Sequence, residues 1–276
     1  MHQYAHIISR CFVNVPYPRL VRDFDLIRSH RLQPEIGLEG ECLYTTPHAE
    51  FAATAAKLQA EGLACTIHAP FFDLMPGALD RQILAASRDK LRRAFELLPL
   101  FKPRSIVCHL GFEANKHEGK EEEWFGHALA TFRELLALAE ASGVTMMVEN
   151  TYETSPKQLR ALLETLDSPF ARFCFDLGHS LAFARNSWRD WFPTMAPWLG
   201  QLHIHDNHGD RDAHLAPGQG SFDFAGFFDY LRQAGLDPIW TLEPHTEEAL
   251  WQSLAALDRM DCFKREKSHN AETQRR

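Results

Sequence analysis

The chain has 276 residues, of which 45% are hydrophobic and 24% charged, and its formal net charge is −8. This composition is typical of a globular domain, and the length is ordinary for a single α/β barrel. The negative charge argues against a protein that coats nucleic acid broadly, although it leaves room for a local basic groove.

Short apolar runs rich in β-branched and aromatic residues recur at fairly even intervals along the chain. Most of these runs are continuous rather than alternating, which is typical of strands that are buried on both faces of a parallel sheet. We therefore predict eight strands, at residues 6–12, 34–38, 63–70, 104–111, 143–150, 171–179, 200–207 and 237–245.

Helical patterns separate these runs. The segment 81–101 places apolar residues at helical spacing, and the segment 121–142 opens with three glutamates and ends before Gly143, which suits both ends of a helix. We predict further helices at residues 155–166 and 222–235, and the second of these ends on a glycine.

The alternation of eight strands with about eight helices predicts an α/β fold, a (β/α)8 TIM barrel that forms a single domain over residues 1–262. An open, doubly wound sheet is the alternative, and it is disfavoured because no G-x-G-x-x-G follows the first strand. Residues 263–276 are polar and basic, and we expect them to form a frayed C-terminal tail.

The six cysteines include no C-x-x-C pair, and Cys65, Cys108 and Cys174 lie in apolar runs. This pattern predicts reduced core thiols and a cytoplasmic location. The N-terminus lacks the pattern of a signal peptide, and no window approaches 18 consecutive apolar residues. We therefore expect neither a signal peptide nor a membrane span.

Residue types that ligate metals stand at the ends of six predicted strands, and in such a barrel the C-terminal ends of the strands carry the chemistry. The stretch HIHDNHGDRDAH (203–214) is the densest, with four histidines and three aspartates. The strand ends and the loop after the seventh strand supply nine residues: His68, His109, Glu149, Asp176, His179, His205, Asp212, His214 and Glu243.

Burying so many ionisable groups together is costly, because neighbouring carboxylates repel one another, and a divalent cation removes that cost. One histidine or aspartate at a strand end is usually just a satisfied polar residue, but nine of them together predict a metal site. His203 is expected to point into the barrel as well, because side chains alternate along a strand. Asp206, His208 and His245 are left open between ligand and loop residue.

Several short motifs together resemble the xylose-isomerase-like TIM-barrel superfamily, which includes sugar isomerases and epimerases and the endonuclease IV family of apurinic-site nucleases. The resemblance covers roughly residues 60–245. The motifs are IHAPF (67–71), CHLG (108–111), VEN (148–150), FDLGH (175–179), HIHDN (203–207), DAHLAPGQG (212–220) and LEPH (242–245).

The resemblance to the epimerase branch implies one metal, held by Glu149, Asp176, His205 and Glu243. It also implies that His179 and Arg211 bind the substrate, and with a single metal His68 and His109 are further substrate-binding residues. Glu149 and Glu243 then act as a base and acid pair that exchanges protons with a sugar next to its carbonyl.

The resemblance to the endonuclease IV branch implies three zinc ions held by nine residues, and all nine positions are filled with the expected types: His68, His109, Glu149, Asp176, His179, His205, Asp212, His214 and Glu243. DNA contact requires basic residues and side chains that wedge into the duplex. The loops after the first three strands, FVNVPYP, EGECLYTTP and FFDLMPGALDR, carry aromatic residues but only one arginine. This weakens the nuclease interpretation.

We therefore predict a divalent-metal-dependent isomerase or epimerase of a sugar or sugar phosphate, with one to three zinc, manganese, cobalt or magnesium ions. The alternative is a zinc-dependent apurinic/apyrimidinic endonuclease, and only under this alternative is DNA a partner. A barrel that keeps its metal for structure or small-molecule binding is disfavoured by the intact pair Glu149 and Glu243. A homo-oligomer is compatible with the sequence, and no membrane partner is expected.

Overall fold

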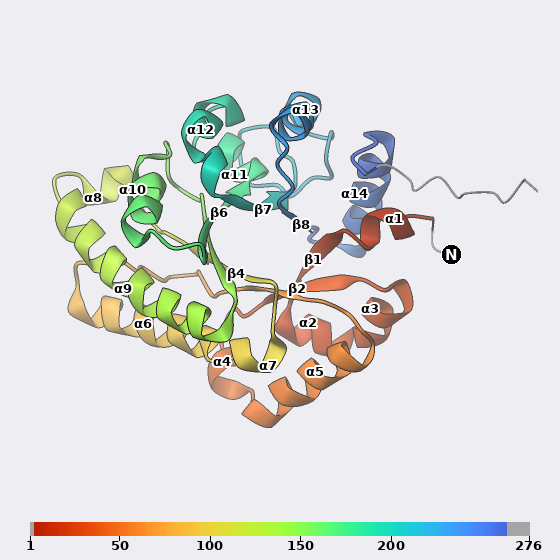
Figure 1. Cartoon of the computed structure of the whole chain (residues 1–276), viewed down its shortest axis with the longest axis horizontal. Coiled ribbons are helices and arrows are strands. Elements are labelled where there is room, and N and C mark those ends of the chain that lie inside the picture. The colour runs from red at the N-terminus through yellow and green to blue at the C-terminus, as the bar shows by residue number, and fades with distance from the viewer. Residues whose placement is uncertain (1–2, 264–276) are drawn as a thin grey trace, which may run out of the picture.

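The computed structural model describes residues 3–263 (Figure 1). Eight parallel strands pair in sequence order, and β1 also pairs with β8, so that the sheet closes into a barrel. The predicted (β/α)8 barrel is therefore confirmed. The strands are β1 (Cys11–Pro16), β2 (Gln33–Gly37), β3 (Thr66–His68), β4 (Ser105–His109), β5 (Thr145–Glu149), β6 (Ala171–Asp176), β7 (Leu199–Ile204) and β8 (Ile239–Leu242).

The helices surround the strands on the outside of the barrel, and α6 and α9 lie side by side on one flank (Figure 1). Their apolar faces pack against the sheet and form one core with it. The helices are α1 (Ala5–Ile8), α2 (Tyr17–Arg22), α3 (Phe24–His30), α4 (Cys42–Thr45), α5 (His48–Ala60), α6 (Arg81–Phe95), α7 (Leu98–Phe101), α8 (Ala114–His117), α9 (Glu121–Ser142), α10 (Lys157–Leu166), α11 (Leu177–Ala182), α12 (Trp188–Met195), the short 3-10 helix η1 (Ala196–Trp198), α13 (Phe224–Ala234) and α14 (Glu247–Arg259).

The first strand begins later than predicted. Residues Ala5–Ile8 form the helical turn α1, which packs against α14, and the strand starts only at Cys11. Ile7 and Ile8 are buried in this turn. A short apolar run alone does not distinguish a buried helical turn from a strand, and this explains the error.

The predicted helix at 81–101 is in fact two helices, because α6 ends at Phe95 and α7 begins at Leu98. Pro99 accounts for the break: it has no amide hydrogen to donate to the carbonyl of Phe95, and its ring would clash with that carbonyl in a continuous helix. The helix predicted at 121–142 matches α9, and Gly143 ends it with a φ of 66°.

The packed part of the chain extends through Phe263, whose ring contacts Trp240 with the centroids 4.7 Å apart. The sequence predicted a tail over residues 263–276. Apart from Phe263, the residues of this tail lie outside the described part of the chain. Within residues 3–263, no helix combines the length and the apolarity that crossing a membrane requires.

The loop that follows β7 is held over the mouth of the barrel by the buried carboxylate of Asp206. The backbone N–H groups of Gly218, Gly220 and Phe222 donate to this carboxylate over 2.8–3.1 Å. Asp206 also pairs with Leu215 through two backbone hydrogen bonds of 2.8 Å. Asp206 is thus an anchor of the loop that carries the residues predicted to follow the seventh strand.

The junction between β6 and α11 is so close to β7 that it requires a glycine. A methyl group built on Gly178 would overlap the imidazole ring of His205. The glycine of the FDLGH motif therefore allows the end of β7 to place a histidine directly against the start of α11.

We expect Gly178→Ala to displace the His205 ring and to lower the free energy of unfolding by about 2–3 kcal/mol, because overpacking a full interior forces side chains and backbone to shift. Gly126→Ala is the matched control: this glycine lies in α9 with nothing within 4 Å of an added methyl group. It should stabilise the helix by up to about 1 kcal/mol. Urea unfolding followed by circular dichroism measures both, and equal stability of Gly178→Ala and wild type would refute the proposed contact.

Candidate metal centre

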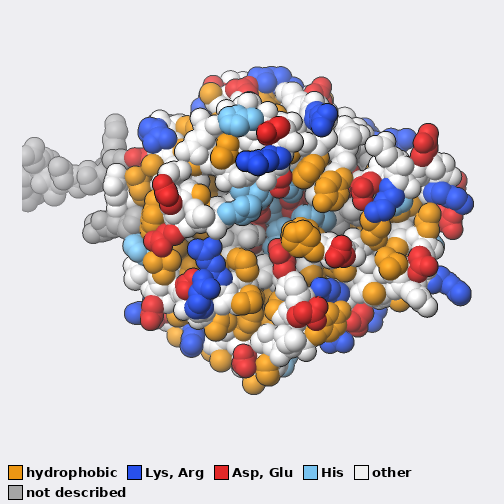
Figure 2. Space-filling model, turned by 180° about the vertical axis from the view of Figure 1, so that it is seen from behind, with side chains coloured by type: hydrophobic (Ala, Val, Ile, Leu, Met, Phe, Trp, Pro, Cys, Tyr) orange, Lys and Arg blue, Asp and Glu red, His pale blue; other side chains and the backbone are white. Residues whose placement is uncertain are grey.

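The C-terminal ends of the strands open into a cavity of about 390 Å³. Figure 2 shows histidines and carboxylates at the bottom of a hollow whose rim carries hydrophobic side chains. Asp176 and His205 are buried beside this cavity, within 3.7 Å of its walls. The other seven predicted ligands line it: His68, His109, Glu149, His179, Asp212, His214 and Glu243.

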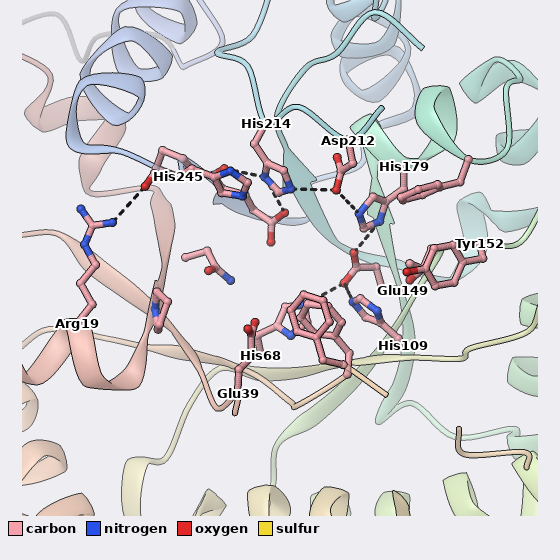
Figure 3. Close-up of a pocket in the computed structure, with 18 residues that line it drawn as sticks. Arg19, Glu39, His68, His109, Glu149, Tyr152, His179, Asp212, His214 and His245 are labelled. Carbon is pink, nitrogen blue, oxygen red and sulfur yellow. Dashed lines mark hydrogen bonds and ion pairs between the residues drawn. The ribbon is translucent and has the colours of Figure 1, made fainter. Parts of the chain in front are cut away.

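The carboxylate of Glu149, at the end of β5, is surrounded by histidines (Figure 3). It is 1% exposed. Its oxygens lie 3.3 Å from Nε2 of His68, 3.2 Å from Nε2 of His109, 3.2 Å from Nδ1 of His179 and 3.2 Å from Nδ1 of His203. Three other strands and the start of α11 thus place imidazole nitrogens around a single carboxylate.

Two further clusters of side chains adjoin the cluster around Glu149. His205 Nε2 lies 3.0 Å from Asp176 and 3.7 Å from Glu243. Asp212, on the anchored loop, lies 3.4 Å from His179 Nε2 and 3.0 Å from His214 Nε2. The predicted residues therefore form one continuous constellation across the barrel mouth.

Asn150 holds Asp176, and with it the cluster of Asp176, His205 and Glu243, in place. Its side chain accepts a hydrogen bond from the backbone N–H of Asp176 and donates one to the backbone carbonyl of Asp176, over 2.9 and 3.0 Å. The Asp176 carboxylate in turn accepts from the N–H of His179 over 2.6 Å and caps α11. The neighbouring strand ends are thus locked together before any ligand binds.

The donor set fits a divalent cation. Leaving buried polar atoms unpaired is costly, and a cation bound by nitrogen and oxygen ligands would satisfy them together. Among the described residues, the buried atoms of this constellation that lack a hydrogen-bond partner are both carboxylate oxygens of Glu149, His109 Nε2, His203 Nδ1, His205 Nδ1 and Asp212 Oδ1.

The surroundings of Glu149 and Glu243 shift the pKa values of these two carboxyl groups in opposite directions. Burial favours the neutral form of Glu149, but His203 and His109 outweigh burial and hold its pKa well below the usual range. Burial raises the pKa of Glu243, and His203 offsets this effect only in part. The surroundings therefore favour ionisation of Glu149 and oppose ionisation of Glu243.

Several histidines of the constellation hold protons tightly. Burial opposes the charge of His68, but Glu149 outweighs it and raises the pKa of His68 to about 9. Burial opposes the charge of His214 in the same way, and Asp212 raises the pKa of His214 to about 9. Without a cation, protons on these rings balance the charge of the carboxylates.

His203 points into the barrel, as its position in the strand predicts, whereas Arg211, implied by the resemblance to the epimerase branch, lies outside the cavity. His203 Nδ1 lies 3.1 Å from Glu243 and 4.0 Å from Asp176, in addition to its contact with Glu149, so this ring is more central than His205. The alternation along β7 was the signal for His203. Arg211 is exposed and is not among the described residues that line the cavity. Arg19 is one of the lining residues.

A family model for the xylose isomerase-like TIM barrel matches residues 36–265. Uncharacterized protein MJ1311 of Methanocaldococcus jannaschii is 25% identical over 188 residues, which cover 64% of this chain and 63% of that protein. The chain thus spans less than two thirds of the length of this relative.

Solved structures share the barrel. A D-tagatose 3-epimerase-like protein superposes with a TM-score of 0.78 at 20% identity, over 90% of this chain and 96% of the other. The TTHB071 protein of Thermus thermophilus, in crystals soaked with zinc chloride, superposes with a TM-score of 0.77 at 23% identity, over 93% and 100%. At these identities the likeness shows the fold.

Zinc binding should release protons and strengthen as the pH rises. Histidines whose pKa lies near 9 are protonated at neutral pH, and a metal binds only the deprotonated nitrogen. We expect the apparent affinity to rise by about tenfold per pH unit for each proton displaced, between pH 6 and about 9. Calorimetric titration at pH 7 in two buffers of different ionisation enthalpy counts the protons. Affinity that does not change with pH, without proton release, would contradict this interpretation.

Proposed function

The chain belongs to the xylose isomerase-like TIM-barrel family, and on this basis we propose that it is a divalent-metal-dependent isomerase or epimerase of a sugar or sugar phosphate. One observation supports this most directly. Glu149 and Glu243 line the cavity, and Glu149 Oε2 and Glu243 Oε1 lie 3.2 and 3.1 Å from the same buried atom, His203 Nδ1.

Isomerisation and epimerisation of sugars move a proton on a carbon next to a carbonyl, and both need a base and an acid. Glu149, whose pKa is held low, suits the base, and Glu243, whose pKa is raised, suits the acid. Two carboxyl groups whose surroundings drive their pKa values apart are the usual sign of such a division of roles.

Glu149, Asp176 and Glu243 would hold the cation together with His203 and His205. A bound divalent cation would polarise neighbouring oxygens of the substrate. His109 and His179, which line the cavity, are placed to hydrogen-bond the hydroxyl groups of a sugar.

The walls and the size of the cavity suit a small sugar. A volume of about 390 Å³ admits a monosaccharide or its phosphate. The exposed rings of Phe72 and Tyr152 offer apolar faces to the C–H groups of a sugar ring. Arg19 stands at the mouth, where its guanidinium donates to the carbonyl of His245 over 3.3 Å (Figure 3). We propose Arg19, in place of the exposed Arg211, as the group that meets a substrate phosphate.

A second candidate, hydrolysis of a phosphoester, is favoured by the number of ligand groups. Among the described residues, five sets each bring their ligand atoms within 4.8 Å of one another, and three of these sets consist entirely of the nine predicted ligands. Several cations together stabilise the attacking and leaving oxygens of a phosphoester, as the apurinic-site nucleases of this superfamily require. The three sets are His68, His109 and Glu149; Asp176, His179 and His205; and His205, Asp212 and His214.

We expect Glu243→Gln to reduce interconversion of the sugar substrate by about 10²–10⁴-fold at saturating metal, because a general acid is lost while the shape of the side chain is kept. Glu248→Gln is the control, because Glu248 is exposed on α14 and bonds only to Gln252 among the described residues. Its activity should equal that of wild type. The assay follows a panel of ketoses and ketose phosphates with zinc, manganese or cobalt added.

Metal-loaded wild-type protein is also tested on bis(4-nitrophenyl) phosphate and on duplex DNA with an abasic site. Turnover of either phosphoester, with no change in the sugar panel, would replace the isomerase by the hydrolase. Nicking of abasic DNA that weakens steeply as salt rises would identify the nuclease form of that activity.

A further inference from the structure

A buried polar layer lies inside the barrel, directly beneath the metal centre. The interior of such a barrel is usually filled by branched apolar side chains. Here the carboxylate of Glu35, on β2, occupies it without any solvent exposure. The side chains around it are equally buried and come from four other strands: Thr66, Ser105, Gln201, His203 and Thr241.

Hydrogen-bond donors surround Glu35. Its Oε2 accepts from Gln201 Nε2 over 2.6 Å, from Thr66 Oγ1 over 2.9 Å and from Thr241 Oγ1 over 3.2 Å. Its Oε1 accepts from Asn14 Nδ2 over 3.3 Å. A carboxyl group that accepts throughout is an ionised carboxylate, since a protonated one would have to donate.

Glu35 fixes the direction in which the Gln201 amide faces, because a carboxylate can only accept. The Gln201 amide must turn its NH₂ group toward Glu35 Oε2, and the Ser105 hydroxyl then donates to Gln201 Oε1 over 2.6 Å. A reversed amide would set Gln201 Oε1 against the carboxylate and lose the bond to Glu35. The carboxylate of Glu35 is therefore fixed in position and acts only as a hydrogen-bond acceptor.

The remaining neighbour of Glu35 is the imidazole of His203. Glu35 Oε1 lies 3.1 Å from His203 Nε2. A carboxylate can only accept, so Nε2 must carry the hydrogen that lies between them. The opposite nitrogen, Nδ1, faces Glu149 and Glu243 at 3.2 and 3.1 Å and has no hydrogen-bond partner among the described residues.

We propose that Glu35 is a positioning residue of the metal centre: it holds His203 with the hydrogen on Nε2, so that Nδ1 presents its lone pair to the cation shared with Glu149 and Glu243. This inference rests on the proposed metal dependence and goes beyond it. A carboxylate behind a ligating histidine fixes the tautomer and the orientation of the ring and strengthens the ligand.

The first test is Glu35→Gln, titrated with Co²⁺ and Zn²⁺. The amide that replaces the carboxylate can donate to Nε2 and so favour the wrong tautomer. We expect affinity to fall by about 10–100-fold, as for other partners of metal-ligating histidines, and the visible spectrum of the Co²⁺ protein to change. Equal affinity and an unchanged spectrum would overturn the proposal.

Ser105→Ala is the matched control. It removes a buried hydrogen bond of the same network, but the Ser105 hydroxyl touches Gln201 and not His203. It should lower thermal stability without the metal yet leave Co²⁺ affinity within about threefold of wild type. If the two variants lose stability and metal affinity in proportion to each other, the role of Glu35 is only structural and the proposal is wrong.

A measurement on the unmodified protein decides the question even if Glu35→Gln does not fold. In Zn²⁺-loaded protein labelled with ¹⁵N-histidine, the His203 ring is assigned by its loss in His203→Asn. We expect a protonated Nε2 and a metal-bound Nδ1, and a protonated Nδ1 would refute the proposal. Wild-type protein that binds neither Co²⁺ nor Zn²⁺ would refute the proposed metal dependence itself, which separates the two failures.

Discussion

The burial of several carboxylates around one point is the constraint on which the rest of the structure depends. Glu35, Glu149, Asp176 and Glu243 are each at most 9% exposed. Burying one unpaired carboxylate is expensive, and burying four within contact of shared partners would be prohibitive without positive charge between them. The histidines supply that charge as protons, and a divalent cation would supply it in their place.

The side chains that balance this buried charge lie in two layers inside the barrel. The upper layer consists of residues at strand ends, where Glu149 and its histidines face the cavity. The lower layer, around Glu35 and Gln201, lies inside the strands and is linked to the upper one by the ring of His203. Hydrogen bonds between backbone groups and the side chains of Asp206 and Asn150 then fix the loop after β7 and the end of β6. His203 and Asp176 are thereby oriented by partners, Glu35 and Asn150, that are themselves held by hydrogen bonds.

The upper layer could be predicted from the sequence, and the lower one could not. Each predicted ligand follows a buried apolar run, and closure of the barrel brings such ends together whatever the lengths of the loops. Glu35 and Gln201 lie within strands, at inward positions that are usually apolar. A glutamate inside the predicted strand 34–38 and a glutamine inside the predicted strand 200–207 were signals for this layer.

Loop residues were less predictable for a different reason. Arg211 was implied by the resemblance to the epimerase branch, but the bonds of Asp206 to Gly218 and Gly220 set the path of the loop in this chain. Arg19 reaches the mouth because α2 begins directly after β1. The helix predicted at 81–101 was divided by Pro99, and the strand predicted at 6–12 began as a buried helical turn.

Anomalous diffraction at the zinc absorption edge, from crystals grown with Zn²⁺, tests the central claim most directly. The account predicts a peak about 2.0–2.2 Å from a carboxylate oxygen of Glu149 and from a histidine nitrogen of the same site, the usual distances for zinc. If the data show no peak at these residues and the carboxylates remain paired directly with protonated histidines, the constellation is a buried ion-pair network and the proposed metal centre is wrong.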